Sequence, residues 1–241
     1  MPRFYCAQPL VIGARFALPP ALAHHVQVLR LAPGALITLF NGEGGEFTAI
    51  IGSTGRKSVE VEIKAFSPRE VELPYAITIA QALPEASKMD WIVEKAVELG
   101  ATALQPLAAQ RCVVRLAGDR AEKRLLHWQA IAVSAAEQSG RNRVMHVAQI
   151  ADFGSYVAQQ DLHLRILLSP NAPTSLSQWA RHQPPRSVTL MVGPEGGFSE
   201  AETERTAANG VLALSMGARV LRTETAGLAA LAALNAVWGE M

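Results

Sequence analysis

The sequence predicts an α/β protein in two parts, a β-rich first part followed by a part in which strands alternate with helices. In the first part, apolar and polar residues alternate, most clearly at 59–63, as in strands with one buried face. In the second part, short apolar runs such as 188–192 are separated by stretches of helical periodicity, which is typical of a parallel sheet covered by helices. We therefore predict two domains, residues 1–70 and 74–241, joined by a connector that contains prolines.

The first part is predicted to be a small β-barrel with a single helix. Strands are expected at 36–40, 47–51 and 59–63. A glycine-rich turn at 41–45 joins the first two strands. The helix is expected over residues 20–30, because Leu22, Val26 and Leu29 share one face of it.

The second part is predicted to hold five strands and four main helices. The strands are expected at 75–80, 104–107, 164–168, 188–192 and 211–214. The helices are expected between Ser87 and Gly100, over 119–139, after Ser199, and from about Thr225. Ser87 is placed as a helix cap and Gly100 at the position where glycine ends a helix. Ser199 and Glu202 have the spacing of a capping box, which marks a helix start.

Two glycine-containing segments follow the last two predicted strands, at 193–199 (GPEGGFS) and 216–226 (MGARVLRTETA). In an open α/β sheet, ligands bind at such strand ends. Gly193, Gly196 and Gly197 tolerate a positive φ or the close approach of a ligand. One such segment alone would be read as an ordinary turn, but two together favour a binding site. The sequence patterns of dinucleotide and phosphate-binding loops are absent from the chain.

Composition limits the class of protein. The chain is 49% hydrophobic and 18% charged, which excludes an intrinsically disordered protein. Its apolar runs are too short to span a bilayer, and its start shows no signal peptide. Cys6 and Cys112 are isolated thiols, so we expect no metal site and a cytoplasmic location. The net charge of +1 does not by itself predict nucleic-acid binding, which would need locally clustered cations.

Five segments in order resemble the RsmE family of ribosomal RNA methyltransferases, within the SPOUT class of knotted methyltransferases. Besides the two glycine segments, they are residues 24–31 (HHVQVLRL), 95–100 (KAVELG) and 136–141 (AEQSGR). The resemblance implies an N-terminal PUA-like RNA-binding β-barrel followed by a SPOUT α/β trefoil-knot domain, in a homodimer. It also implies S-adenosylmethionine as cofactor and methylation at N3 of a uridine in the 16S RNA of the small ribosomal subunit. Met145, Met216 and Val220 depart mildly from the family pattern.

The resemblance also implies which residues form the sites. For the cofactor these are Val192, Gly193, Pro194, Glu195, Gly196, Gly197, Leu214, Ser215, Met216, Gly217, Val220, Leu221, Arg222, Thr223, Thr225 and Ala226. For the RNA they are Arg3, His24, His25, Arg30, Gln138, Ser139 and Arg141. Bare glycine loops suit the cofactor, because backbone groups can reach adenine without obstruction. Glu195 is expected to organise its loop rather than act as a base.

Methylation at N3 requires loss of the imide proton of uracil. A cation such as Arg141 or Arg222 would favour the uracil anion, as any opposite charge does. We predict Arg141, Arg222 and Glu137 as catalytic residues, with Glu224 or bulk water as alternatives to Glu137 as the base. Gln138 can match the edge of a uracil with both donors and acceptors.

Three alternative functions were weighed. Another SPOUT activity, such as ribose or guanine methylation of transfer RNA, is disfavoured by the barrel and by the EQSGR segment. A non-catalytic RNA-binding assembly protein is disfavoured by the intact cofactor loops. A nucleotide hydrolase would need a phosphate-loop lysine that the sequence lacks. The apolar stripe of Leu228, Leu231, Leu234 and Trp238 is expected to be packing, partly across subunits.

Overall fold

The computed structural model describes residues 1–56, 58–85, 87–160 and 163–239, and the chain forms two compact units. Unit 1 consists of Met1–Glu72 and Ala136–Val144, and unit 2 of Leu73–Ala135 and Met145–Met241. The nine residues 136–144 thus join the first unit although they lie far along the chain, which no local sequence pattern indicates. In the described ranges, no helix is both long and apolar enough to cross a membrane.

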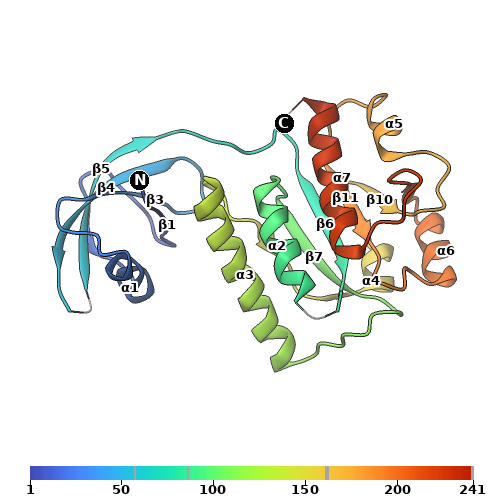
Figure 1. Cartoon of the computed structure of the whole chain (residues 1–241), viewed down its shortest axis with the longest axis horizontal. Helices are drawn as coiled ribbons and strands as arrows, with labels where there is room; N and C mark the ends of the chain where they lie inside the picture. The colour runs from blue at the N-terminus through green and yellow to red at the C-terminus, as the bar shows by residue number, and fades with distance from the viewer. Residues whose placement is uncertain (57, 86, 161–162, 240–241) are drawn as a thin grey trace. The chain divides into compact units, whose positions relative to one another are not determined.

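Unit 1 contains a five-stranded sheet and one helix (Figure 1). Its elements are β1 (Arg3–Tyr5), β2 (Arg15–Ala17), α1 (Pro20–Val28), β3 (Leu36–Phe40), β4 (Glu46–Thr54) and β5 (Val59–Ser67). The strands lie in the order β1-β3-β4-β5-β2, with β1 parallel to β3 and the other neighbours antiparallel.

The core of unit 1 follows the predicted alternation. In β5, Val59, Val61 and Ile63 are buried while the residues between them face outward. Helix α1 buries Val26, but Leu29, predicted on the same face, is 46% exposed because the helix ends at Val28. Strands β1 and β2 were not predicted, since runs of three residues carry little periodicity.

Unit 2 is built on a seven-stranded sheet in which every pairing is parallel. Its strands are β6 (Ile77–Ala82), β7 (Ala103–Ala108), β8 (His146–Val147), β9 (Ala151–Asp152), β10 (Leu164–Leu168), β11 (Val188–Val192) and β12 (Leu212–Leu214). They lie in the order β12-β10-β11-β6-β7-β8, and β9 also pairs with β7. The prediction of a mostly parallel sheet is confirmed, and all five residues of β11 are buried.

Six helices accompany this sheet: α2 (Lys88–Glu98), α3 (Asp119–Ser139), α4 (Phe153–Ala158), α5 (Leu176–Ala180), α6 (Glu200–Ala208) and α7 (Thr223–Trp238). Helix α7 packs against α2, α5, β6 and β11, and α4 packs against α6 (Figure 1). The apolar stripe of α7 is buried within the single chain, with Trp238 edge-on to Tyr75 at 4.9 Å between ring centroids.

The predicted helix caps have mixed outcomes. The capping box at the start of α6 is confirmed, since Ser199 and Glu202 bond each other's backbone N–H groups. The glycine ending α2 is also confirmed, because Gly100 has a φ of +91°. The cap predicted for Ser87 is wrong: α2 starts after it, but its hydroxyl makes no capping bond to the helix.

Candidate cofactor and RNA sites

A cavity of about 760 Å³ lies at the carboxyl ends of three neighbouring strands of unit 2. Its wall is formed by residues 169–171 after β10, residues 193–198 after β11, and residues in 216–226 after β12. This volume is in the range of sites that enclose a molecule of cofactor size. The cavity therefore lies where the order of strands in a parallel sheet places ligand sites.

Most of the predicted cofactor residues contribute to the cavity wall. They are Val192, Gly193, Pro194, Glu195, Gly196, Gly197, Met216, Val220, Leu221, Arg222, Thr223 and Ala226. Four others do not line it: Leu214, Ser215, Gly217 and Thr225. Leu214 and Ser215 are buried at the end of β12, where the Ser215 N–H donates to the carbonyl of Thr174. Leu168, Ser169 and Lys88 also line the cavity, and no motif in the sequence pointed to them.

The glycines of the 193–197 loop have different roles. Gly197 has a φ of +68°, in the left-handed region that favours glycine. At Gly193, an added Cβ would lie 3.2 Å from both Gly197 Cα and the Phe198 nitrogen, so the loop's own backbone requires the glycine. At Gly196 neither constraint applies, because a Cβ would only contact the Arg111 side chain at 3.6 Å. Gly196 therefore does not need a positive φ, and the close approach of a ligand expected there stays a prediction.

Side chains distant in sequence brace this loop. One guanidinium nitrogen of Arg111 donates to the carbonyl of Gly196 at 2.9 Å. Glu202 accepts from the N–H of Ser199 at 2.8 Å and from the N–H of Gln110 at 2.7 Å. The capping box of α6 thus also ties the loop to the segment after β7.

A buried hydrogen-bonded chain joins the two glycine segments. The amide nitrogen of Gln81, at the end of β6, donates to the Thr223 hydroxyl at 2.9 Å. That hydroxyl donates to the carbonyl of Gly193 at 2.6 Å. Gln81 is fully buried and Thr223 is 7% exposed. Gln81 thereby fixes the start of α7 against the end of β11.

A lysine and two carboxylates meet at the cavity wall. The Lys88 ammonium lies 2.6 Å from a carboxylate oxygen of Glu195 and 3.9 Å from Oε2 of Glu224. The hydrogen bond to Glu195 raises the pKa of Lys88. Partial burial works to raise the pKa of Glu195, but the bonds from Lys88 and from the Glu85 N–H outweigh it and lower that pKa. Glu195 is thus held as a loop-organising anion, as its position suggested.

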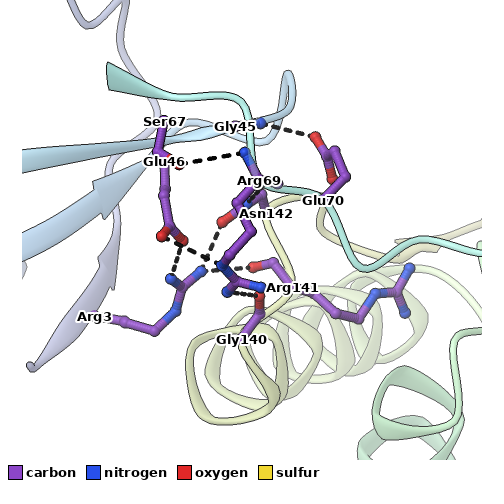
Figure 2. A network of polar contacts seen from close by, with 9 residues as sticks. All are labelled: Arg3, Gly45, Glu46, Ser67, Arg69, Glu70, Gly140, Arg141 and Asn142. Atoms are coloured by element: carbon purple, nitrogen blue, oxygen red, sulfur yellow. Dashed lines mark hydrogen bonds and ion pairs between the residues drawn. The ribbon is translucent and has the colours of Figure 1, made fainter. Parts of the chain in front are cut away.

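In unit 1, a polar network holds residues 140–142 against the barrel (Figure 2). Arg3 forms an ion pair with Glu46 and donates to the Asn142 side-chain oxygen at 2.7 Å. Arg69 also pairs with Glu46 and donates to the carbonyl of Gly140 at 2.8 Å. Arg3, predicted to contact RNA, is therefore engaged inside this network.

Arg141, predicted to act on the uracil, is 4% exposed. Its guanidinium forms a two-pronged ion pair with Glu72, in which Nε donates to Oε1 at 3.0 Å. In this arrangement one edge of the guanidinium, with Nε and one terminal nitrogen, is bonded to an internal carboxylate. The role predicted for Arg141 stays a prediction, and the pairing with Glu72 was not foreseen.

Glu137 lies in the last turn of α3 and accepts the N–H of Tyr5 at 2.8 Å. Burial raises the pKa of this carboxyl above its ordinary value, although the Tyr5 N–H and the nearby His25 and Arg3 work in the opposite direction. A carboxylate with a raised pKa is suited to accept a proton. The structure thus gives Glu137 one property of a general base.

The other predicted RNA contacts lie at the surface of unit 1. His24, His25, Arg30 and Gln138 are exposed, and Ser139 is half-buried. His25 stacks edge-on against Phe4, with 5.2 Å between the ring centroids. Arg30 has a φ of +54°, which is uncommon for a residue other than glycine.

Comparison with known proteins identifies both units. The model of an RNA methyltransferase domain matches residues 71–235, and that of an RNA methyltransferase PUA domain matches residues 18–64. The ribosomal RNA small subunit methyltransferase E of Bacillus subtilis is 34% identical over 91% of this chain and 89% of its own. The chain belongs to the ribosomal RNA small subunit methyltransferase E family.

Solved structures agree with membership of the methyltransferase E family. The family member from Neisseria gonorrhoeae, bound to S-adenosylmethionine, is 40% identical, with a TM-score of 0.93 over 99% of this chain and 98% of that one. A methyltransferase from Legionella pneumophila, also in complex with S-adenosylmethionine, is 36% identical, with a TM-score of 0.92 over 98% and 97%. The predicted fold class, a PUA-like domain followed by a SPOUT methyltransferase domain, is confirmed.

Proposed function

We propose that this protein transfers the methyl group of S-adenosylmethionine to N3 of a specific uridine in 16S ribosomal RNA. The observation that carries the proposal is the cavity at the ends of β10, β11 and β12, in a chain of the methyltransferase E family. Two relatives of this fold hold S-adenosylmethionine. The small-subunit target follows from the name that the sequence relatives share.

The residues of the cavity fit the proposed cofactor. The 193–197 loop presents backbone N–H and C=O groups that can read the edge of adenine. Leu167, Val192 and Leu221 supply an apolar wall for a flat ring. Glu224 and Lys88 supply opposite charges at the same wall. When bound, S-adenosylmethionine supplies an activated methyl group on a sulfonium.

Three residues are proposed to support the chemistry of the uracil. Arg222 is exposed, lines the cavity and stands directly before the first residue of α7, so its charge is available to favour the uracil anion. Glu137, with its raised pKa, is proposed to accept the imide proton. For Arg141 we propose a positioning role, in which its pair with Glu72 holds the turn after α3 and so orients Gln138 and Ser139.

The RNA is proposed to bind unit 1 through the exposed side chains of His24, His25 and Arg30. The match of residues 18–64 to the PUA domain of RNA methyltransferases supports an RNA-binding role for unit 1. We further propose a homodimer that acts on the small ribosomal subunit in the cytoplasm. The family resemblance supports the dimer, and the proposed ribosomal substrate supports the location.

The test is methyl transfer to defined RNA. Purified protein and labelled S-adenosylmethionine are incubated with 16S RNA, with small subunits or with transfer RNA, each from cells that lack the gene. Methylation at N3 blocks the pairing edge of uracil, so reverse transcription should stop at one uridine of 16S RNA. Label in ribose or in transfer RNA would instead indicate another SPOUT activity. Cofactor binding without transfer to any of these RNAs would indicate an assembly protein.

A further inference from the structure

Glu224, in the first turn of α7, lines the cavity and has an oxygen without a hydrogen-bond partner. Its side chain is 17% exposed, and Oε2 is buried from solvent. A buried carboxylate oxygen that accepts no hydrogen bond is destabilising, because the attraction of an ammonium 3.9 Å away does not replace the hydrogen bonds to water that burial removes. This oxygen therefore lacks a donor that a bound molecule can supply.

The charge nearest to Glu224 does not meet this need. The Lys88 ammonium is 3.9 Å from Oε2, beyond hydrogen-bond distance, and it is bonded to Glu195 at 2.6 Å. Lys88 and Glu224 thus stand side by side on the wall with opposite charges. Such a pair matches a zwitterion, in which a cation and an anion are separated by a few bonds. Arg219 and Arg222 add further positive charge to the same cavity.

We propose that Glu224 binds the α-ammonium group at the amino-acid end of S-adenosylmethionine. The inference rests on the proposed function and assigns one subsite within it. The ammonium offers N–H donors to the unpartnered oxygen, which the sulfonium cannot do. A carboxylate beside the sulfonium would also stabilise the reactant more than the transition state, since the positive charge at sulfur is lost on methyl transfer. Binding of the ribose hydroxyls by Glu224 would leave the neighbouring Lys88 without a role in ligand binding, because the hydroxyls are neutral.

The proposal is tested by calorimetric titration of three ligands that share the adenosine part. S-adenosylmethionine and S-adenosylhomocysteine carry the α-ammonium, and 5′-methylthioadenosine lacks the whole amino-acid end. In Glu224→Gln, the Kd of the first two should rise roughly tenfold or more, as for loss of a charge-assisted hydrogen bond. The Kd of 5′-methylthioadenosine should stay unchanged, so the ratio of the affinities reports the amino-acid end alone.

Glu200→Gln is the matched control, because it removes the same charge from the first turn of α6, directly after the 193–199 loop and outside the cavity wall. Glu200 is exposed and does not line the cavity, so its loss should not change the ratio between S-adenosylhomocysteine and 5′-methylthioadenosine. Thermal melting without ligand checks that both variants are folded. The same selective loss in Glu200→Gln would overturn the proposal in favour of a general electrostatic field of the carboxylates around the cavity.

Other outcomes of the Glu224→Gln titration also overturn it. Equal weakening of all three ligands would place Glu224 at the ribose or in the loop structure. Weakening of S-adenosylmethionine alone would place it at the sulfonium, and unchanged affinities would remove it from the site. Failure of the wild-type protein to bind any of the three would instead contradict the proposed function, which separates the two hypotheses.

Discussion

The glycine-containing segments after β11 and β12 in unit 2 and the segment 140–142 in unit 1 lie in contrasting surroundings. In unit 2, the segments 193–197 and 216–226 border a cavity of about 760 Å³. In unit 1, the segment 140–142 lies in a network in which Arg3 and Arg69 are paired with Glu46 (Figure 2). Arg141 of this segment is paired with Glu72. The segments of unit 2 thus line an open cavity, whereas the segment of unit 1 is held by ion pairs and hydrogen bonds to other side chains.

The difference shows how charge is used in each unit. At the cavity, Arg111, Glu202 and the Lys88–Glu195 pair organise the loop, while Glu224 keeps an oxygen without a hydrogen-bond partner. In the network, Arg3 and Arg69 share the carboxylate of Glu46, and Arg141 is paired with Glu72 of the same unit. A buried arginine paired in this way contributes to how segments are held together more directly than to ligand binding. The following predictions test this contrast, from the largest to the smallest expected change in free energy.

Removal of Arg141 should have the largest effect on stability. Arg141→Ala leaves the carboxylate of Glu72, whose side chain is 14% exposed, without its partner. Breaking a buried pair in this way costs about 3–5 kcal/mol. All four tryptophans lie in unit 2, so their fluorescence does not report on unit 1 directly. The lost stability of unit 1 should therefore be measured as faster hydrogen exchange of the backbone amides in β3, β4 and β5.

The control for Arg141→Ala is the double variant Arg141→Ala/Glu72→Gln. It removes the uncompensated charge, so part of the lost protection should return. If both variants lose protection equally, the ion pair is not the source of the effect. If neither loses any, Arg141 is not a structural residue and its predicted contact with the uracil gains weight.

Loss of the buried hydrogen bonds of the Thr223 hydroxyl should have the second largest effect on the free energy of unfolding. Thr223→Val keeps the shape but leaves the Gln81 amide and the Gly193 carbonyl without this partner, at roughly 1–3 kcal/mol. We expect a lower melting temperature and weaker binding of S-adenosylmethionine in titration. Thr223→Ser retains the hydroxyl and should behave like the wild type. A loss confined to Thr223→Ser would instead attribute the effect to the methyl group, which Thr223→Val retains.

The glycine loop allows a comparison of neighbouring positions. Gly197→Ala forces a side chain into the left-handed region, at roughly 1–2 kcal/mol. Gly196→Ala places its Cβ at ordinary contact distance from Arg111 and should be tolerated. Cofactor titration should therefore show weaker binding for Gly197→Ala only. The reverse order of effects would mean that ligand contact at Gly196, rather than loop conformation, decides affinity.

Glu137→Gln should change stability least while reducing methyl transfer. Burial raises the pKa of Glu137, so the ionised form is disfavoured in the folded state. Protonated Glu137 therefore contributes to the free energy of unfolding. This contribution is complete below the carboxyl's ordinary pKa of 4.5, and it is lost as pH rises through the raised pKa of Glu137 in the folded protein. The glutamine retains an acceptor for the Tyr5 N–H without this pH dependence.

The measurement for Glu137→Gln is melting temperature against pH, together with single-turnover methyl transfer. The variant should be as stable as the wild type near neutral pH, or more so, and should transfer more slowly. Normal transfer would exclude Glu137 as the base. A large loss of stability at neutral pH would instead give the carboxylate a structural role.

The predictions from sequence were most accurate where they depended on neighbouring residues. The apolar run 188–192 was sufficient to predict a buried strand, and Ser199 with Glu202 predicted the start of α6. The loops after β11 and β12 were placed at a ligand site because strand ends of a parallel sheet meet at one edge. These features follow from periodicity, capping and chain order, which are local properties of the sequence.

Pairings between distant residues were decided by tertiary structure. Lys88 meets Glu195 across 107 positions, Gln81 meets Thr223 across 142, and Arg141 meets Glu72 across 69. No local pattern distinguishes an arginine that will be buried against a carboxylate from one that will face a ligand. The sequence alone determined the two-part α/β architecture and the loops of the cofactor cavity. Tertiary structure decided which charged side chains form ion pairs inside the protein, because these pairs depend on which surfaces come together when the chain folds. For the same reason, only the tertiary structure shows that an oxygen of Glu224 lacks a hydrogen-bond partner.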